Sequence, residues 1–303
     1  MNAIDTTVRG EPEPQRMQCM EVWGGNRETN RVFTMPGLAT WVFSRPHLQA
    51  SSGGDVYYLS SCASGRITRF LLADVMGHGA GASDTARYLR DLMRENINLI
   101  QQTRLVRSMN QQFSDSTEQG GFATALVGTY FAPRRSLALC NAGHPFPLLY
   151  RAAERHWSLI QRPEPQPGPP VDMPLGVIRE TDYMLTETRL DPGDLLLAFS
   201  DAVIESCDRR GSLLGSEGVL AMVRQLDASR PAELISNLLE RILTEDTTNL
   251  SQDDVTLLLL QVRETRPTLK ANLLAPFRLF GKVTDATRWN WERFGSGTRR
   301  RDS

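Results

Sequence analysis

The sequence predicts an α+β fold in which helices cover the outer faces of packed antiparallel sheets. Three observations lead to this class. Between residues 17 and 262, most of the chain consists of short β-rich runs separated by glycine and proline turns. The amphipathic helical segments are few, and they come in pairs between groups of strands. The chain has no internal repeat, so a layered domain is favoured over an array of repeated units.

Length alone leaves the number of domains open. A chain of 303 residues could hold two average domains or one larger domain with extended ends. Hydrophobic residues make up 40% of it and charged residues 23%, which excludes a fibrous or wholly disordered chain. We expect a disordered lead-in at residues 1–16, a strand-rich N-terminal extension at 17–49, one main domain at 50–262 and a basic, aromatic tail at 263–303.

The N-terminal half begins with strands. Short apolar pieces between residues 17 and 47 are separated by glycine and proline, and another β-rich run begins in the sequence GGDVYY. Residues 66–76 form an apolar run of the buried type that ends at Gly77, His78 and Gly79. A buried strand therefore leads directly into a glycine-rich loop.

Two helices are expected after this loop. The first carries one apolar stripe at steps of three and four residues, made of Ala82, Ala86, Leu89, Met93, Ile97 and Ile100. The second carries Leu105, Val106, Met109 and Phe113 at similar steps. Both stripes are typical of helices that bury one face against a sheet.

The C-terminal half returns to strands. The runs FATALVGTYF and SLALCNAG are joined by four residues, APRR, a length that predicts an antiparallel hairpin. Residues 163–174 form a proline-rich loop. Further strands are expected at 183–190, 194–200 and 254–262, with helices at 216–226 and 232–244 between the last two.

The charge of the chain is unevenly distributed. The net charge is −1, but residues 263–303 hold ten basic and four acidic side chains, a balance of +6 that leaves −7 on the rest. The main domain thus lacks the basic footprint of nucleic-acid-binding proteins, and we expect no nucleic-acid partner. The tail also contains Leu, Phe and Trp, a composition that suits docking on an acidic partner or a membrane surface as well as a disordered extension.

The cysteines and the hydropathy of the chain predict its cellular location. The four cysteines, Cys19, Cys62, Cys140 and Cys207, lie far apart, without the spacing of a zinc site or a redox dithiol, so we expect free and mostly packed thiols. The N-terminus has no signal-peptide-like apolar stretch, and no apolar run approaches the roughly 18 residues of a membrane span. A cytoplasmic protein is expected.

Four aspartates share a local context, because each flanks an apolar strand beside glycine or another small or acidic residue. They are Asp55, Asp74, Asp201 and Asp253. Any one of them could simply belong to a turn or cap a helix, but several carboxylates at strand ends need a cation to offset their desolvation. Oxygen ligands without clustered histidine or cysteine favour Mg²⁺ or Mn²⁺. The chain has no G-x-S-x-G or P-loop pattern, so a serine hydrolase or a phosphate-loop enzyme is not supported.

A series of segments also resembles a known family. GGDVYY, ADVMGHG, GGFATALVGTYF, CNAGHPFPLL, PLG, DPGDLLLAFSDAVIES, LLGSEG and QDDVTLLLL occur in this order across residues 50–262. Their order and spacing are similar to those of the bacterial stage II sporulation protein E-type phosphatases, a branch of the metal-dependent type 2C serine/threonine protein phosphatases. The resemblance implies a two-sheet antiparallel β-sandwich flanked by helices, with two Mn²⁺ or Mg²⁺ ions at one end.

Site roles follow from the resemblance position by position. Asp74 would bridge the two metals, the carbonyl of Val75 would join it, and Asp55, Asp201 and Asp253 would complete the shell. A bridging hydroxide would then attack the phosphorus of a phosphoserine or phosphothreonine, a reaction that suits a pair of divalent ions. The implied substrate is a phosphorylated regulatory protein, such as an anti-sigma-factor antagonist. Paired helices of some relatives form a switch or a dimer contact, which leaves a homodimer open.

The sequence departs from the family pattern at three positions. Met76 stands where type 2C enzymes of eukaryotes have a histidine proposed as general acid, so His78 and His144 remain as candidates for proton transfer or for a purely structural role. Ala202 stands where relatives usually have glycine, and it would be strained if that backbone needs a positive φ. Tyr58 replaces an acidic residue. Ala202 supports an alternative function, a catalytically weak scaffold that binds a phosphorylated partner without turnover.

Overall fold

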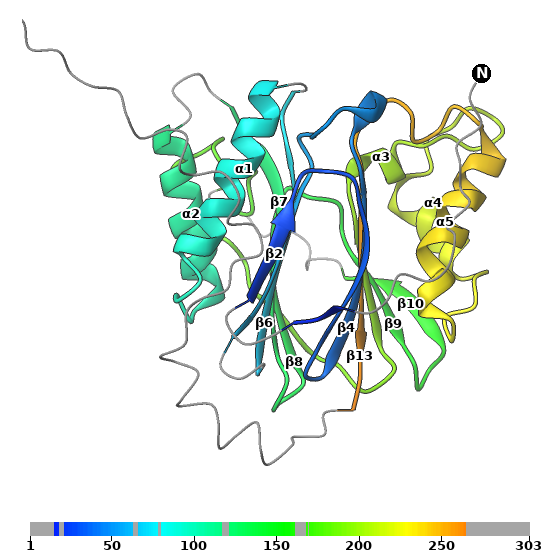
Figure 1. Cartoon of the computed structure of the whole chain (residues 1–303), viewed down its shortest axis with the longest axis horizontal. Helices are drawn as coiled ribbons and strands as arrows, with labels where there is room; N and C mark the ends of the chain where they lie inside the picture. Colours follow the sequence, from blue (N-terminus) through cyan, green and yellow to red (C-terminus); the bar gives the residue numbers. More distant parts are fainter. Residues whose placement is uncertain are drawn as a thin grey trace, which may run out of the picture.

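Two β-sheets packed face to face form the centre of the molecule, and helices cover the outer face of each (Figure 1). The computed structural model describes residues 15–17, 21–62, 66–77, 80–116, 121–160, 168 and 170–264. Residues 1–14 of the predicted lead-in, half of the proline-rich loop and nearly all of the basic tail lie outside these residues, whereas the end of the lead-in, Gln15–Arg16, forms a short strand instead of a disordered segment. No helix of the described chain has the length and apolar character to span a membrane.

The first sheet, sheet A, has seven strands, and the second, sheet B, has six. In spatial order, sheet A contains β1 (Gln15–Arg16), β3 (Thr29–Met35), β4 (Leu38–Arg45), β13 (Val255–Val262), β12 (Leu195–Phe199), β9 (Leu148–Arg151) and β10 (His156–Leu159). Sheet B contains β11 (Thr186–Arg189), β8 (Ser136–Ala142), β7 (Ala123–Phe131), β6 (Ile67–Val75), β5 (Val56–Cys62) and β2 (Glu21–Gly25). The helices are η1 (His47–Gln49), α1 (Ala80–Glu95), α2 (Gln102–Ser116), α3 (Asp201–Ile204), α4 (Gly215–Val223) and α5 (Pro231–Glu245).

Alternation along the strands separates an inner core from two outer cores. Along β12, Leu196 and Ala198 point toward sheet B, whereas Leu195, Leu197 and Phe199 point toward the helices. A strand that is buried on both faces must be apolar at nearly every position, which is why the sequence LLLAF shows no polar alternation. The sandwich therefore has three hydrophobic layers.

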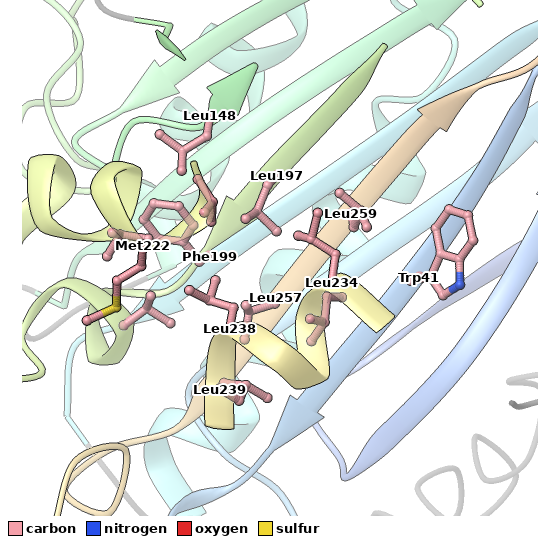
Figure 2. Close-up of a cluster of buried hydrophobic side chains, with 14 of the residues drawn as sticks. Trp41, Leu148, Leu197, Phe199, Met222, Leu234, Leu238, Leu239, Leu257 and Leu259 are labelled. Atoms are coloured by element: carbon pink, nitrogen blue, oxygen red, sulfur yellow. The ribbon is translucent and has the colours of Figure 1, made fainter. Parts of the chain in front are cut away.

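Helices α4 and α5 cover the outer face of sheet A (Figure 1). Figure 2 shows Leu234, Leu238 and Leu239 of α5 facing Leu257 and Leu259 of β13. These side chains recur along one side of α5, as the sequence pattern predicted for this segment. Full burial of a side chain of this size contributes about 1.5–3 kcal/mol, so α5 is held mainly by this stripe.

Helices α1 and α2 cover the outer face of sheet B in the same way (Figure 1). The predicted stripes pack there, but two residues assigned to the first stripe lie beyond the helix: Ile97 is partly buried, and Ile100 is 90% exposed, so its assignment to the stripe was wrong. The helix ends at Glu95 because the Asn96 side chain donates to the Leu92 carbonyl oxygen (2.9 Å) and accepts from the Ser108 hydroxyl (2.7 Å). The chain turns away before Ile100.

The fold class and the central hairpin agree with the sequence, whereas two features of the edges differ. β7 and β8 are antiparallel neighbours, as the four-residue connection predicted. The short β1 pairs in parallel with β3, so sheet A is not purely antiparallel. The hairpin of β9 and β10 was not predicted, because LLYR and HWSL are short and lack clear alternation. Cys140 and Cys207 are free cysteines, as expected.

Candidate metal centre

The four predicted aspartates lie at one end of the sandwich, and Asp201 is the first residue of α3. In sheet B, Asp55 immediately precedes β5 and Asp74 is the penultimate residue of β6; these strands are antiparallel, with Val56 opposite Ala73. In sheet A, Asp201 lies two residues after β12 and Asp253 two residues before β13; these strands are also antiparallel, with Phe199 opposite Leu257. Strand polarity therefore places both pairs at strand ends.

A carboxylate from sheet A joins the two strand ends. Oδ2 of Asp254, the residue before β13, accepts hydrogen bonds from the backbone N–H groups of Gly54 (2.5 Å) and Asp55 (3.1 Å) of sheet B. Its Oδ1 accepts from the N–H of His47 (2.6 Å). The two carboxylate-bearing edges are thus within hydrogen-bonding distance of each other.

The acidic residues at this end raise one another's pKa. Burial, followed by the charges of Asp201, Asp253, Asp254 and Glu205, raises the pKa of Asp74 to about 7. Burial, followed by the charges of Glu205 and Asp253, raises the pKa of Asp201 to about 6, against the opposing effect of nearby backbone N–H groups. Like charges that share a partly buried site disfavour ionisation, so this end of the protein favours cations.

Asp55 is the most deeply enclosed member of the group, and only 3% of its surface is exposed. Its pKa lies well above the usual range because of burial and the charge of Asp74, although the hydroxyls of Thr256 and Ser200 oppose the shift. Its Oδ2 atom has no hydrogen-bond partner among the described residues. A buried carboxylate oxygen without a donor is costly, and a bound cation would satisfy it.

The chemistry of the donors at this end of the sandwich fits a divalent metal ion. The donors are carboxylate oxygens without sulfur or histidine, a set that suits Mg²⁺ or Mn²⁺. Across the part of the chain that the structure describes, no three Asp, Glu, His or Cys side chains converge into a complete metal cage. The donors therefore fit the metal in chemistry and in location, without forming a preformed cage.

The remaining predicted ligands lie around the same end. Asp253 is exposed, and its Oδ1 accepts a hydrogen bond from the Asp254 N–H (2.7 Å). Val75 is buried at the end of β6, and its carbonyl oxygen would lie 3.0 Å from a Cβ added to Gly54. The Val75 carbonyl therefore borders the turn that carries Asp55. Gly77 lies two residues after the end of β6 and has a φ of +97°, a conformation that favours glycine.

Sequence reasoning missed two acidic residues of this centre. Asp254 was passed over in favour of its neighbour Asp253, although the doublet in SQDDV offered both. Glu205 is exposed and lies one helical turn after Asp201, and its N–H donates to the Asp201 carbonyl oxygen (2.8 Å). The four-residue spacing to Asp201 was the available signal, because residues four apart on a helix share a face.

The two histidine candidates differ in what the structure shows. His78 lies outside the described residues. His144 is buried, and burial lowers the pKa of its ring to about 3, against the opposing effect of the Phe199 backbone. Its Nδ1 is 3.0 Å from the hydroxyl of Thr124, which lies opposite Asp74 across β6 and β7. Burial thus favours the neutral ring, which is linked to the strand beside Asp74, an arrangement that suits a structural role.

The three positions that depart from the family pattern lie in different surroundings. Met76 is half exposed, and Tyr58 is fully buried in the layer between sheet B and its helices. Ala202 lies inside α3, and it is absent from the described non-glycine residues with positive φ. The strain expected at Ala202 is thus not present, because the chain enters a helix directly after Ser200.

Comparison with known proteins identifies the family to which the chain is similar. The model of the family described as Stage II sporulation protein E (SpoIIE) matches residues 64–263. The chain is also 22% identical to the phosphoserine phosphatase RsbU of Bacillus subtilis over 193 residues, which cover 63% of this chain and 54% of RsbU. It thus spans about half the length of that relative.

Solved structures share the fold. The PP2C phosphatase domain of SpoIIE from Bacillus subtilis, solved with a fragment of its regulatory domain, has a TM-score of 0.61 at 17% identity, covering 81% of this chain and 64% of that one. The catalytic domain of the serine/threonine protein phosphatase PstP, solved in complex with two manganese ions, has a TM-score of 0.51 at 17% identity, covering 75% of this chain and 99% of that one. The fold is that of the type 2C phosphatases.

Proposed function

This chain belongs to the stage II sporulation protein E family, and from this membership and its acidic centre we propose that it is a metal-dependent serine/threonine protein phosphatase. Its substrate would be a phosphoserine or phosphothreonine on a bacterial regulatory protein, such as an anti-sigma-factor antagonist. The observation that carries the proposal is the buried Oδ2 of Asp55, which lacks a donor and belongs to a side chain under the charge of Asp74. We assign the phosphatase domain to residues 50–262, with 17–49 as its extension.

The proposed ligands are side chains of Asp55, Asp74, Asp201 and Asp253, together with the carbonyl of Val75. Two Mn²⁺ or Mg²⁺ ions held there would supply an activated water as the nucleophile and would neutralise charge on the phosphoryl oxygens. Asp74 receives the charge of more acidic neighbours than Asp201 does, which supports a central position for its carboxylate. Glu205 adds a further carboxylate at the exposed side of the same group.

Other residues of the chain hold this centre in place. Asp254 fixes the turn before Asp55 through two backbone N–H groups, so the Asp55 carboxylate keeps its depth in the site. His144 anchors the strand opposite Asp74 through Thr124, and its main chain is tied to Asn141 by bonds of 2.7 and 2.9 Å. A neutral buried imidazole of this kind does not donate the proton that the leaving serine needs.

The scaffold alternative loses its main support. It rested on backbone strain at Ala202, and Ala202 occupies an ordinary helical position. A scaffold of the same fold would still bind a phosphorylated partner, so turnover is the property that separates the two functions.

A turnover assay tests the proposal. The full chain is incubated with Mn²⁺ and either p-nitrophenyl phosphate or a phosphoserine peptide, beside Asp74→Asn and a control, Asp182→Asn, whose side chain is 70% exposed and pairs with Arg107. We expect Mn²⁺-dependent turnover that Asp74→Asn lowers by at least about 100-fold and that the control retains. No Mn²⁺-dependent turnover above the level of Asp74→Asn would leave the scaffold as the function.

A further inference from the structure

Asn26 forms a buried polar node beside the turn that carries Asp55, and only 4% of its surface is exposed. Its Nδ2 donates to the carbonyl oxygen of Gly53 (2.8 Å), to the carbonyl oxygen of Ser83 (3.1 Å) and to the Ser83 hydroxyl (2.9 Å). The main-chain carbonyl oxygen of Asn26 accepts from the Gly53 N–H (2.8 Å). One side chain thus holds both the turn and the first part of α1.

The node extends to a second hydroxyl. Ser83 in α1 is buried, and its Oγ donates to the Oγ of Ser52, just before the turn, at 2.7 Å. The turn is therefore joined to α1 directly through the two serines and indirectly through Asn26. Buried side-chain amides are stable only with their hydrogen bonds formed, so this arrangement fixes the relative position of the three segments.

The opposite side of the turn is held by Asp254. Its carboxylate accepts from Gly54 and Asp55, and a Cβ added to Gly53 would lie 2.2 Å from its Oδ2. Asn26 and Asp254 thus bind consecutive peptide groups of the turn from two sides. Asp55 leaves this turn with its unpartnered Oδ2 in the acidic centre.

The strand β2 explains how Asn26 reaches this place. β2 is antiparallel to β5, with Gly25 opposite Tyr57, so the residue after Gly25 lies beside the residues before β5. A side chain at Gly24 would meet the Tyr57 carbonyl oxygen at 2.7 Å, so glycine there permits this close pairing. Asn26 precedes residues 64–263, the part matched by the SpoIIE family model.

We propose that Asn26 is a positioning residue of the metal centre, which sets the depth of the Asp55 carboxylate by holding the Gly53–Asp55 turn against α1. The proposal rests on the proposed phosphatase function, because it assigns Asn26 a role in binding the metal of that site. It gives the N-terminal extension a part in supporting the metal centre. A residue that served only to stabilise the fold would lower the unfolding temperature without a change in metal affinity.

The test measures metal binding separately from turnover. Mn²⁺ affinity is measured by titration calorimetry on the full chain for the wild type, Asn26→Ala and Asn30→Ala; Asn30 is exposed on β3 and serves as the matched control. We expect Asn26→Ala to weaken Mn²⁺ binding about 10-fold, as the loss of residues that orient metal ligands typically does. The control should bind like the wild type. With p-nitrophenyl phosphate, the Mn²⁺ concentration for half-maximal activity should rise, while kcat at saturating Mn²⁺ stays within about threefold.

A second variant, Ser83→Ala, tests the proposal if Asn26→Ala does not fold. Ser83→Ala keeps the bond from Asn26 to Gly53 but removes the links from the Ser83 hydroxyl to Asn26 and Ser52, so we expect a smaller loss of Mn²⁺ affinity, about threefold. The loss of Mn²⁺ affinity in the double variant should be smaller than the product of the two single losses, because both substitutions act on one turn.

The outcomes separate the two proposals. Wild-type Mn²⁺ affinity in folded Asn26→Ala, or in Ser83→Ala if the first variant does not fold, would overturn the positioning role while the phosphatase stands. A wild-type protein that neither binds Mn²⁺ nor turns over phosphate esters would overturn the proposed function and, with it, the role of Asn26.

Discussion

Asp55 and Asp194 are buried to the same extent, each with 3% of its surface exposed, but their surroundings are opposite. The Asp194 carboxylate accepts from the Arg151 guanidinium (2.9 Å) and from the N–H groups of Ala152 (2.8 Å) and Asp191 (2.9 Å). The Asp55 carboxylate faces the charges of Asp74 and Asp254, and its Oδ2 has no donor in the described chain. One carboxylate is satisfied by the fold and the other is not.

The two carboxylates with these different surroundings lie at opposite ends of the sandwich. Asp194 immediately precedes β12, whereas Asp201 lies just beyond the other end of the same strand. A buried carboxylate with a built-in cation and backbone donors is part of the structure. A buried carboxylate beside further carboxylates can be stabilised by a cation from solution, which is why we propose this end of the sandwich as the metal centre.

The largest expected effect is the loss of metal-dependent activity in Asp55→Asn. The amide cannot offset the charge of a divalent ion, so Mn²⁺-dependent turnover should fall by at least about 100-fold. The same change removes a charge that Asp74 repels, so the metal-free protein should unfold at an equal or higher temperature than the wild type. Titration calorimetry and thermal unfolding measure both. A large drop in the unfolding temperature of the metal-free variant would contradict this view of Asp55.

The next effect is a loss of stability in Asp194→Ala. Removal of this carboxylate leaves the partly buried Arg151 guanidinium and two N–H groups without their acceptor, which should cost about 3 kcal/mol. The unfolding temperature should fall by roughly 10 °C, with Mn²⁺ affinity unchanged. Asp191→Asn is the control, because its exposed pair with Arg135 should contribute less than about 1 kcal/mol. A change in Mn²⁺ affinity with intact stability would reverse the contrast with Asp55.

The sequence predicted which aspartates lie at the ends of strands. An apolar run flanked by aspartate locates a carboxylate at the edge of a sheet, and this reasoning found Asp55, Asp74 and Asp201. It also predicted the helices over the sheets, because their apolar stripes have helical spacing. These features are local, so they can be read from neighbouring residues.

Features that depend on contacts between distant segments could not be predicted in this way. Asp253 and Asp254 are adjacent and chemically identical, and only the approach of the turn before β5 turns Asp254 inward. Asn26 gave no signal, because its partners are 27 and 57 residues away in the chain. The helical conformation of Ala202 depends on where β12 ends.

The third effect is a dependence of the metal-free protein on pH. Asp74 and Asp201 have pKa values of about 7 and about 6 in the folded protein, against 3.8 for an ordinary carboxyl. The folded state therefore holds more protons than the unfolded chain between about pH 4 and 7, so stability should fall as the pH rises through this window. The unfolding temperature of EDTA-treated protein should drop by about 5 °C from pH 5 to 7.5. Asp74→Asn should flatten this slope, and an unchanged slope would remove Asp74 as its source.

The smallest expected effect comes from Gly54, which lies between Asp55 and the clamped Gly53. A Cβ in Gly54→Ala would lie 3.0 Å from the Val75 carbonyl oxygen, closer than ordinary contact, so that carbonyl must shift by a few tenths of an ångström. Because the carbonyl is a proposed metal ligand, Mn²⁺ affinity should fall by about threefold, equivalent to under 1 kcal/mol. Gly81→Ala is the matched control in α1, where an added Cβ meets nothing within 4 Å. It should leave Mn²⁺ affinity unchanged and stabilise the helix by about 0.5 kcal/mol. Equal Mn²⁺ affinities for the two alanine variants in titration calorimetry would remove the Val75 carbonyl from the centre, and the contrast between the two ends would then rest on the side-chain carboxylates alone.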